Sequence, residues 1–132
     1  MSAVIDTDVF SFIFKGDTRK SLYEPYTKDR FLFLSFMSLA ELWNWTLTRN
    51  WGINQRTRLE SSLRHYSVQN SNRDICVLWA ELQHEANLAG TPLGESDAWI
   101  AATAIFLDVP LISHNANHFK NIKRLDLITA TE

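Results

Sequence analysis

The sequence has few of the residues that form disulfide frameworks or flexible linkers. It contains one cysteine, four glycines and three prolines among 132 residues. A single cysteine excludes an internal disulfide and a cysteine-rich zinc module, and it fits a reducing compartment. Because glycine and proline are scarce, there is little room for a long flexible linker. We therefore expect a single domain over residues 1–132.

Long hydrophobic runs and strong net charge are also absent. The longest apolar run, 98–107, is half of the roughly 20 residues that a membrane-spanning helix needs. The N-terminus lacks the basic start and cleavage site of a signal peptide, so we expect a cytoplasmic protein with no membrane segment. Thirteen Lys and Arg against fifteen Asp and Glu give a net charge of −2. This balance argues against a protein that binds nucleic acid without regard to sequence.

What the chain does contain is an alternation of strand-like and helical segments. The strand-like segments are 3–5, 31–36, 67–69, 111–113 and 125–129, and the helical segments are 9–14, 18–26, 38–50, 55–66, 73–88 and 97–107. Such alternation predicts an α/β fold around a mostly parallel sheet. In these folds, functional groups gather where the carboxyl ends of the strands meet.

Several polar residues are expected at that edge of the sheet. Asp6 and Asp8 follow the first strand, Glu41 lies early in the helix after the second, and Asp97 and Asn115 flank the fourth. Clustered carboxylates repel one another unless protons or a cation neutralise them. Oxygen ligands without cysteine favour Mg²⁺ or Mn²⁺ over zinc, and such an ion can promote hydrolysis of a phosphate ester.

Each of these residues also has a purely structural interpretation. Ser38 and Glu41 have the spacing of a helix capping box. Asp97 in a first helical turn is stabilised by the helix dipole by about 0.3–1 kcal/mol. Asn115 has the side chain that often holds a turn. Capping and metal binding are compatible, because a cap fixes the position of the side chain.

Four motifs together resemble a known family. They are Val4-Ile5-Asp6-Thr7-Asp8, Ser38-Leu39-Ala40-Glu41-Leu42, Asp97-Ala98-Trp99-Ile100-Ala101-Ala102-Thr103-Ala104, and Leu111-Ile112-Ser113-His114-Asn115 with His118-Phe119. Their order and spacing resemble PIN domains of the VapC toxin type, from residue 4 to about 128. The resemblance implies a three-layer α/β/α sandwich and an endoribonuclease that uses Mg²⁺ or Mn²⁺. It also implies a VapB-type antitoxin as partner, and a homodimer.

The resemblance assigns roles residue by residue. Asp6 and Asp97 match the metal-binding aspartates, and Glu41 matches the helix glutamate, bound to the metal directly or through water. Asn115 stands where members carry either an acid or Asn, and it would orient the phosphate or a water. His118 occupies a position that is often acidic, and Asp8 one that is commonly Asn, so the charge of the site is redistributed. Thr7 and Ser113 are expected to support these groups.

The RNA-binding surface is less sharply indicated. No Lys or Arg occurs from 74 to 119, so the basic residues that can meet backbone phosphates lie elsewhere. Arg49 and Arg56 in the middle and Lys120 near the end are candidates for the rims of an RNA-binding surface. For any one of these residues, an ordinary solvated helix face is the simpler explanation.

Other functions stay open beside the toxin hypothesis. A PIN-like protein that has lost catalysis would act as an RNA- or protein-binding module, and a housekeeping RNA-processing nuclease would need no antitoxin. A phosphatase of the haloacid dehalogenase type also begins with Asp-x-Asp after a strand. That class needs a later lysine and a downstream acidic pair, and this sequence has no lysine from 74 to 119 and no acid in Ser113-His114-Asn115.

Overall fold

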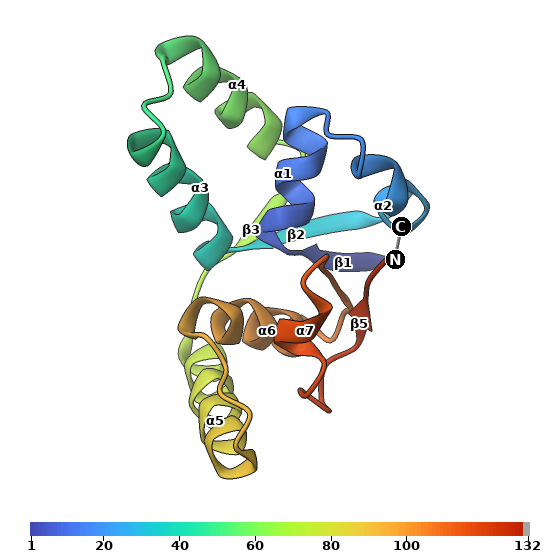
Figure 1. The fold of residues 1–132 in the computed structure, drawn as a ribbon, viewed down its shortest axis with the longest axis vertical. Coiled ribbons are helices and arrows are strands. Elements are labelled where there is room, and N and C mark those ends of the chain that lie inside the picture. The colour runs from blue at the N-terminus through green and yellow to red at the C-terminus, as the bar shows by residue number, and fades with distance from the viewer. Residues whose placement is uncertain (131–132) are drawn as a thin grey trace.

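A parallel sheet forms the centre of the molecule. The computed structural model describes residues 1–130. Within them, five strands pair in parallel in the order β3-β2-β1-β4-β5 (Figure 1). The strands are β1 (Ser2–Ile5), β2 (Phe31–Ser35), β3 (Ser67–Gln69), β4 (Leu111–Ile112) and β5 (Leu127–Ile128). The mostly parallel sheet predicted from the sequence is confirmed.

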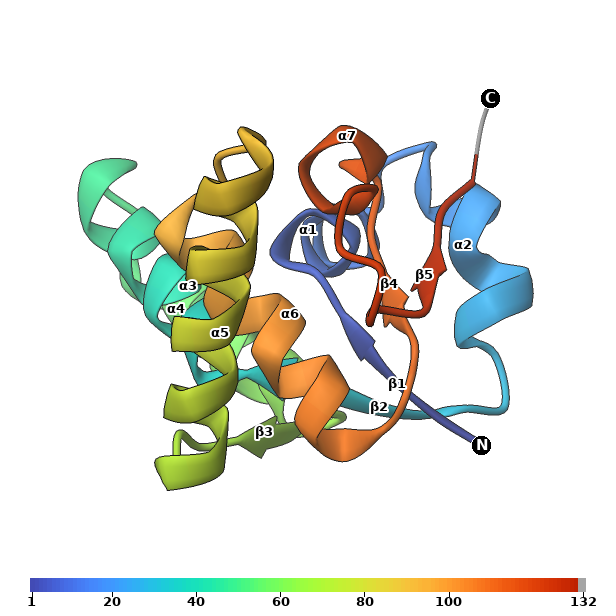
Figure 2. The same cartoon turned by 90° about the horizontal axis from the view of Figure 1, so that it is seen from below.

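Helices cover both faces of this sheet. In the described part of the chain they are α1 (Thr7–Lys15), α2 (Lys20–Thr27), α3 (Phe36–Thr48), α4 (Ile53–Leu63), α5 (Arg73–Ala89), α6 (Glu95–Leu107) and α7 (Ala116–Phe119). Helices α1 and α2 lie on one side of the sheet, and α5 and α6 lie on the other (Figures 1 and 2). The three-layer α/β/α architecture is therefore also confirmed. None of these helices has the length and apolarity needed to span a membrane.

The first strand shows why the sheet is buried on both faces. Successive side chains of a strand point to opposite faces. Ala3 and Ile5 accordingly join the hydrophobic cluster that includes Phe10 of α1, while Val4 joins the cluster that includes Ile100 of α6. All five side chains are at most 1% exposed. A strand with two buried faces needs an almost continuous apolar sequence, as β1 has.

The strand order creates a switch point beside β1. The chain proceeds from β1 to β2 and β3 on one side, then returns to β4 and β5 on the other. In the parallel register, Ile5 pairs with Ile112, so β1 and β4 end side by side. Ligands of open α/β sheets bind at such points, beyond the carboxyl ends of the strands.

Several helix ends differ from the sequence prediction by two or three residues, and one helix was not predicted. Helix α3 begins at Phe36, two residues before the predicted start, because the Ser35 hydroxyl caps it by accepting a 3.1 Å hydrogen bond from the Met37 backbone N–H. Helix α7 was not predicted, because four residues are too few to show a helical period. It is held in place by Phe119, which is 1% exposed.

Candidate active site

Asp6 lies where β1 ends and α1 begins. Its Oδ1 accepts a 2.8 Å hydrogen bond from the Thr7 backbone N–H, as an N-cap residue does, and its Oδ2 accepts a 2.7 Å bond from the Ser113 hydroxyl. Asp6 is 4% exposed and Ser113 is fully buried. Because both oxygens are held, the carboxylate has a fixed orientation at the switch point between β1 and β4.

Glu41 is positioned through Thr7. The Thr7 hydroxyl is hydrogen-bonded to Glu41 Oε1 at 2.9 Å and to Ser38 Oγ at 2.8 Å. A hydroxyl has one proton and a carboxylate only accepts, so Thr7 donates to Glu41 and accepts from Ser38. The N-terminal turn of α1 thereby ties the first turns of α3 to the end of β1.

The predicted capping box of Ser38 and Glu41 is wrong. Ser35 caps the helix instead, so Ser38 already lies inside α3. Ser38 is fully buried, and its hydroxyl faces Thr7, 31 residues earlier in the chain. Its spacing from Glu41 therefore serves a contact between two helices, which frees Glu41 from a capping role.

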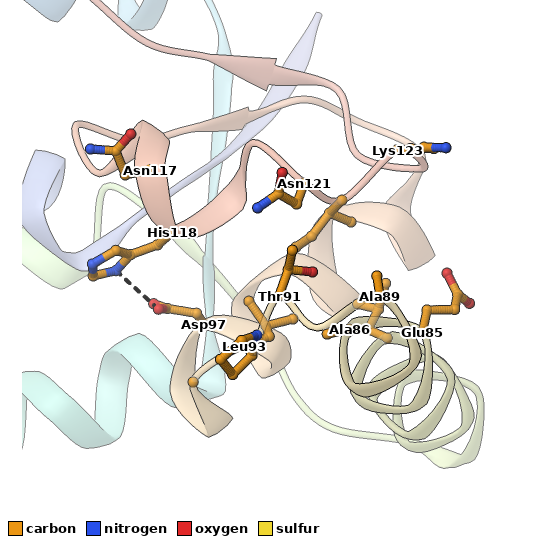
Figure 3. Close-up of a pocket in the computed structure, with 14 residues that line it drawn as sticks. Glu85, Ala86, Ala89, Thr91, Leu93, Asp97, Asn117, His118, Asn121 and Lys123 are labelled. Carbon is orange, nitrogen blue, oxygen red and sulfur yellow. Dashed lines mark ion pairs between the residues drawn. The ribbon is translucent and has the colours of Figure 1, made fainter.

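Asp97 comes from the opposite side of the sheet. It lies in the first turn of α6, and its Oδ2 is 3.1 Å from Nδ1 of His118 on α7 (Figure 3). The two side chains are 25% and 56% exposed. His118, which occupies a position that is often acidic in the family, is thus in direct contact with Asp97.

Electrostatics link these carboxylates into one group. Burial raises the pKa of Asp6, and the charge of Asp97 raises it further against the hydrogen bonds from Ser113 and Thr7. Burial also raises the pKa of Glu41, to which the charges of Asp6 and Asp97 add. For Asp97, burial raises the pKa and His118 opposes the rise. Segments that are far apart in the sequence thus bring three carboxylates close enough that the charge of Asp97 raises the pKa of both Asp6 and Glu41.

Asp8 adds a fourth carboxyl group to this edge. Burial, followed by the charge of Asp6, raises the pKa of Asp8 to about 7. Its oxygens accept hydrogen bonds from the backbone N–H groups of Val9 (2.6 Å) and His114 (3.1 Å), which act against that rise. The carboxyl group is therefore held between α1 and the segment after β4.

Asn115 lies at the outer end of the same segment. Its backbone N–H donates a 3.0 Å hydrogen bond to Ser113 Oγ, the same hydroxyl that donates to Asp6. The residue caps α7 without a side-chain hydrogen bond and is exposed. Its side-chain amide is thus available to a ligand, and the Ser113 hydroxyl connects the Asn115 backbone to the buried Asp6.

A divalent cation matches the chemistry of these residues. The oxygens of Asp6, Glu41 and Asp97 are hard ligands, and their mutual repulsion is what a bound cation relieves. Across residues 1–130, however, no three His, Cys, Asp or Glu side chains lie close enough together to hold a metal ion. The donor set fits a metal in kind and charge, and binding requires the side chains to draw closer.

The predicted RNA-facing residues do not gather at the carboxylates. Arg49 ends α3, and its guanidinium lies 4.2 Å from the centre of the Trp45 ring. Arg56 is exposed on α4. Lys120 is exposed directly after α7, the helix that carries His118. Of the three residues, Lys120 is thus the one joined to the site by a short element.

A supporting contact was missed by the sequence analysis. The hydroxyl of Tyr23, a fully buried residue of α2, lies 2.6 Å from His114 Nδ1. His114 in turn donates its backbone N–H to Asp8. Because Tyr23 and His114 are 91 residues apart, no local sequence pattern signals this contact.

Comparison with known proteins gives the chain its family. Residues 3–125 match the PIN domain family. Ribonuclease VapC1 of Haemophilus influenzae (strain R2866) is 27% identical over 129 residues, covering 95% of each chain. The structure of VapBC2 from Rickettsia felis bound to a promoter DNA fragment aligns with a TM-score of 0.86 at 22% identity, over 99% of this chain and 100% of that chain. VapBC-1 from nontypeable Haemophilus influenzae aligns with a TM-score of 0.80 at 24% identity, over 98% of each chain. The fold of these structures and the extent of the family match lead to one conclusion: this chain belongs to the PIN domain family.

Proposed function

We propose that the chain is a metal-dependent endoribonuclease and the toxin of a VapBC-type toxin–antitoxin pair. The observation that carries this proposal is the set of three carboxylates, from the β1–α1 junction, α3 and α6, at the switch point of the sheet. The relative that covers 95% of the chain is named a ribonuclease, which supports RNA as the substrate.

Asp6, Asp97 and Glu41 would hold the metal ion. A bound Mg²⁺ or Mn²⁺ supplies hydrolytic chemistry by lowering the pKa of a water molecule and neutralising charge on the phosphate. The chain's own contribution is to orient the ligands. Ser113 and the Thr7 backbone hold Asp6, and the Thr7 hydroxyl holds Glu41.

Asn115 would bind the scissile phosphate. Its exposed amide can donate a hydrogen bond to a phosphate oxygen, but an amide cannot accept a proton as a general base. Lys120, five residues later and exposed, is placed to meet a neighbouring backbone phosphate. Arg49 and Arg56 would contact RNA at a greater distance from the carboxylates.

Partners follow from the same comparisons. One structurally similar protein is described as a toxin–antitoxin complex from Klebsiella pneumoniae, and another as a member of the VapBC family of toxin–antitoxin systems from Mycobacterium tuberculosis. We therefore propose a VapB-type antitoxin as the partner of this chain, a homodimer as its assembly, and the cytoplasm as its location.

The test is cleavage of total cellular RNA by the purified protein with Mg²⁺, with Mn²⁺ and with EDTA. We expect discrete fragments that require a metal ion and that disappear with Asp6→Asn and with Asp97→Asn. Asp108→Asn is the matched control, because Asp108 is an exposed aspartate at the other end of α6 and Asn tolerates its left-handed backbone. No cleavage by the folded wild type, or unchanged cleavage by both site variants, would contradict the proposal. The first outcome would favour a binding module.

A further inference from the structure

A cavity opens directly beside Asp97. It has a volume of about 730 Å³ and lies between α5, the loop from Thr91 to Gly94, the first turn of α6, and α7 with the segment after it (Figure 3). This volume is within the range of roughly 300–1,000 Å³ that is usual for small-molecule sites. Asp97 and His118 line one end, so the cavity is continuous with the candidate active site.

The middle of the cavity combines apolar walls with polar groups. Ala86 and Leu93 contribute apolar surface from α5 and the loop, and Ile122 contributes it from the opposite side. Thr91 and Asn121 lie across from each other in the same region (Figure 3). Within residues 1–130, the side-chain amide of Asn121 has no hydrogen-bond partner, and it is exposed to the cavity. The site therefore offers apolar contacts together with an amide that can both donate and accept hydrogen bonds.

The charges at the two ends determine what kind of group fits. Asp97 and His118 form an ion pair at one end. Glu85 and Lys123 lie at the other, and Glu85 Oε2 is 3.3 Å from Nη1 of Arg124. The residues that line the middle are all uncharged, so no positive charge there attracts a phosphate. An uncharged group with polar edges and apolar faces matches it better.

We infer that this cavity binds an unpaired nucleobase of the RNA, next to the phosphate that is cleaved at the carboxylates. The inference rests on the proposed nuclease function and deepens it, since it assigns base selectivity to named residues. The base would lie between Ala86 and Ile122, with its polar edge toward Asn121 and Thr91. The exposed ammonium group of Lys123 is placed at the far end, where the chain of the RNA would continue.

The first test is the base preference of cleavage in a random pool of single-stranded RNA. Ala86→Leu fills the cavity, and Asn121→Leu removes the amide at similar volume. Ala80→Leu is the matched control, because Ala80 is exposed on the same helix and is not part of the cavity lining. We expect wild type and Ala80→Leu to prefer the same base at one position beside the cut. We expect Asn121→Leu to weaken that preference about fivefold, as for the loss of one neutral hydrogen bond, and Ala86→Leu to weaken it by blocking the cavity.

The same preference in wild type, Ala86→Leu and Asn121→Leu would overturn the inference. If the base preference is unchanged in Ala86→Leu but this variant no longer binds a protein partner, the inference is also overturned, because the cavity would then bind a protein segment. Thermal unfolding of all three variants shows whether they are folded.

A second measurement separates this inference from the proposed function. Amide chemical shifts of the metal-free protein are followed by NMR while adenosine, guanosine, cytidine or uridine is added. We expect one of these nucleosides to shift the signals of Thr91 and Asn121 in wild type and Ala80→Leu, but not in Ala86→Leu. This measurement requires no cleavage, so it tests the inference even if the protein does not cut the RNA pool. The absence of such shifts with all four nucleosides would overturn the inference.

Discussion

The two sides of the candidate site differ in how firmly they are held. The inner side, Asp6, Thr7 and Ser113, is at most 5% exposed and is joined by hydrogen bonds across α1, α3 and the segment after β4. The outer side, Asp97 and His118, is partly exposed and depends on one ion pair between α6 and α7. The inner side is therefore preorganised, while the outer side has room to adjust to metal and RNA. The predictions below test this difference.

The largest effect among these supporting residues is expected for Ser113→Ala. The substitution removes the hydrogen bond to Asp6 Oδ2 and the acceptor of the Asn115 backbone N–H. Partners that orient metal ligands typically contribute about ten- to a hundredfold to activity, and we expect a loss of RNA cleavage in that range. Cleavage at the wild-type rate would show that Asp6 does not need this orientation.

A smaller loss is expected for Thr7→Val. It removes the bonds to Glu41 and Ser38 and should lower the free energy of unfolding by about 1–3 kcal/mol and cleavage by about tenfold. Thr103→Val is the control, because its buried hydroxyl is hydrogen-bonded to Ser35 and to the Trp99 carbonyl and to none of the carboxylates. We expect similar destabilisation there with cleavage unchanged. Equal losses of cleavage in both variants would assign Thr7 a structural role alone.

The raised pKa values predict how Mg²⁺ and pH act together on stability. The folded pKa of Asp8 is about 7 against 3.8 for an ordinary Asp side chain, and the pKa values of Asp6, Glu41 and Asp97 are also raised. The folded state thus holds protons that the unfolded chain has released, so the stability of the metal-free protein falls as pH rises between about 4 and about 7.

Thermal unfolding should show this as a metal effect. If Mg²⁺ binds the ionised carboxylates as proposed, it should raise Tm more at about pH 8 than at about pH 5. Asp6→Asn should remove most of the difference. An equal Mg²⁺ effect at both pH values would indicate that the ion binds elsewhere.

The smallest effect is expected for His118→Gln. An exposed ion pair contributes about 0.2–1 kcal/mol, so we expect cleavage to fall by no more than about fivefold. Comparison with Ser113→Ala under the same conditions is the relevant measurement. A larger loss of cleavage for His118→Gln than for Ser113→Ala would contradict the conclusion that the inner side of the site is the more firmly held one.

The fold was predictable because its signals are local. The apolar run at β1 and the polar residues directly after it indicated a buried strand that ends at a functional edge, and the structure places Asp6 there. The same reasoning placed Glu41 and Asp97 at the edge of the sheet where Asp6 lies, and the charges of Asp6 and Asp97 both raise the pKa of Glu41. Their roles in metal binding and catalysis remain predictions.

The contacts that were missed depend on tertiary structure. Ser38 has the spacing of a capping residue, yet its partner is Thr7 on another helix. The cavity requires the loop after α5 to face α7, and α7 is too short to be seen in the sequence. Neither arrangement leaves a periodic or local pattern that could have been recognised beforehand.

The most direct test of the central claim is Mn²⁺ binding, measured by electron paramagnetic resonance on wild type, Asp6→Asn, Glu41→Gln and Asp97→Asn. The claim is that carboxylates from three separate elements form one metal site. We therefore predict that wild type binds Mn²⁺ and that each substitution weakens binding, with Asp108→Asn unchanged. Wild-type binding in both Asp6→Asn and Asp97→Asn would contradict the claim, because the ion would then be held by other residues.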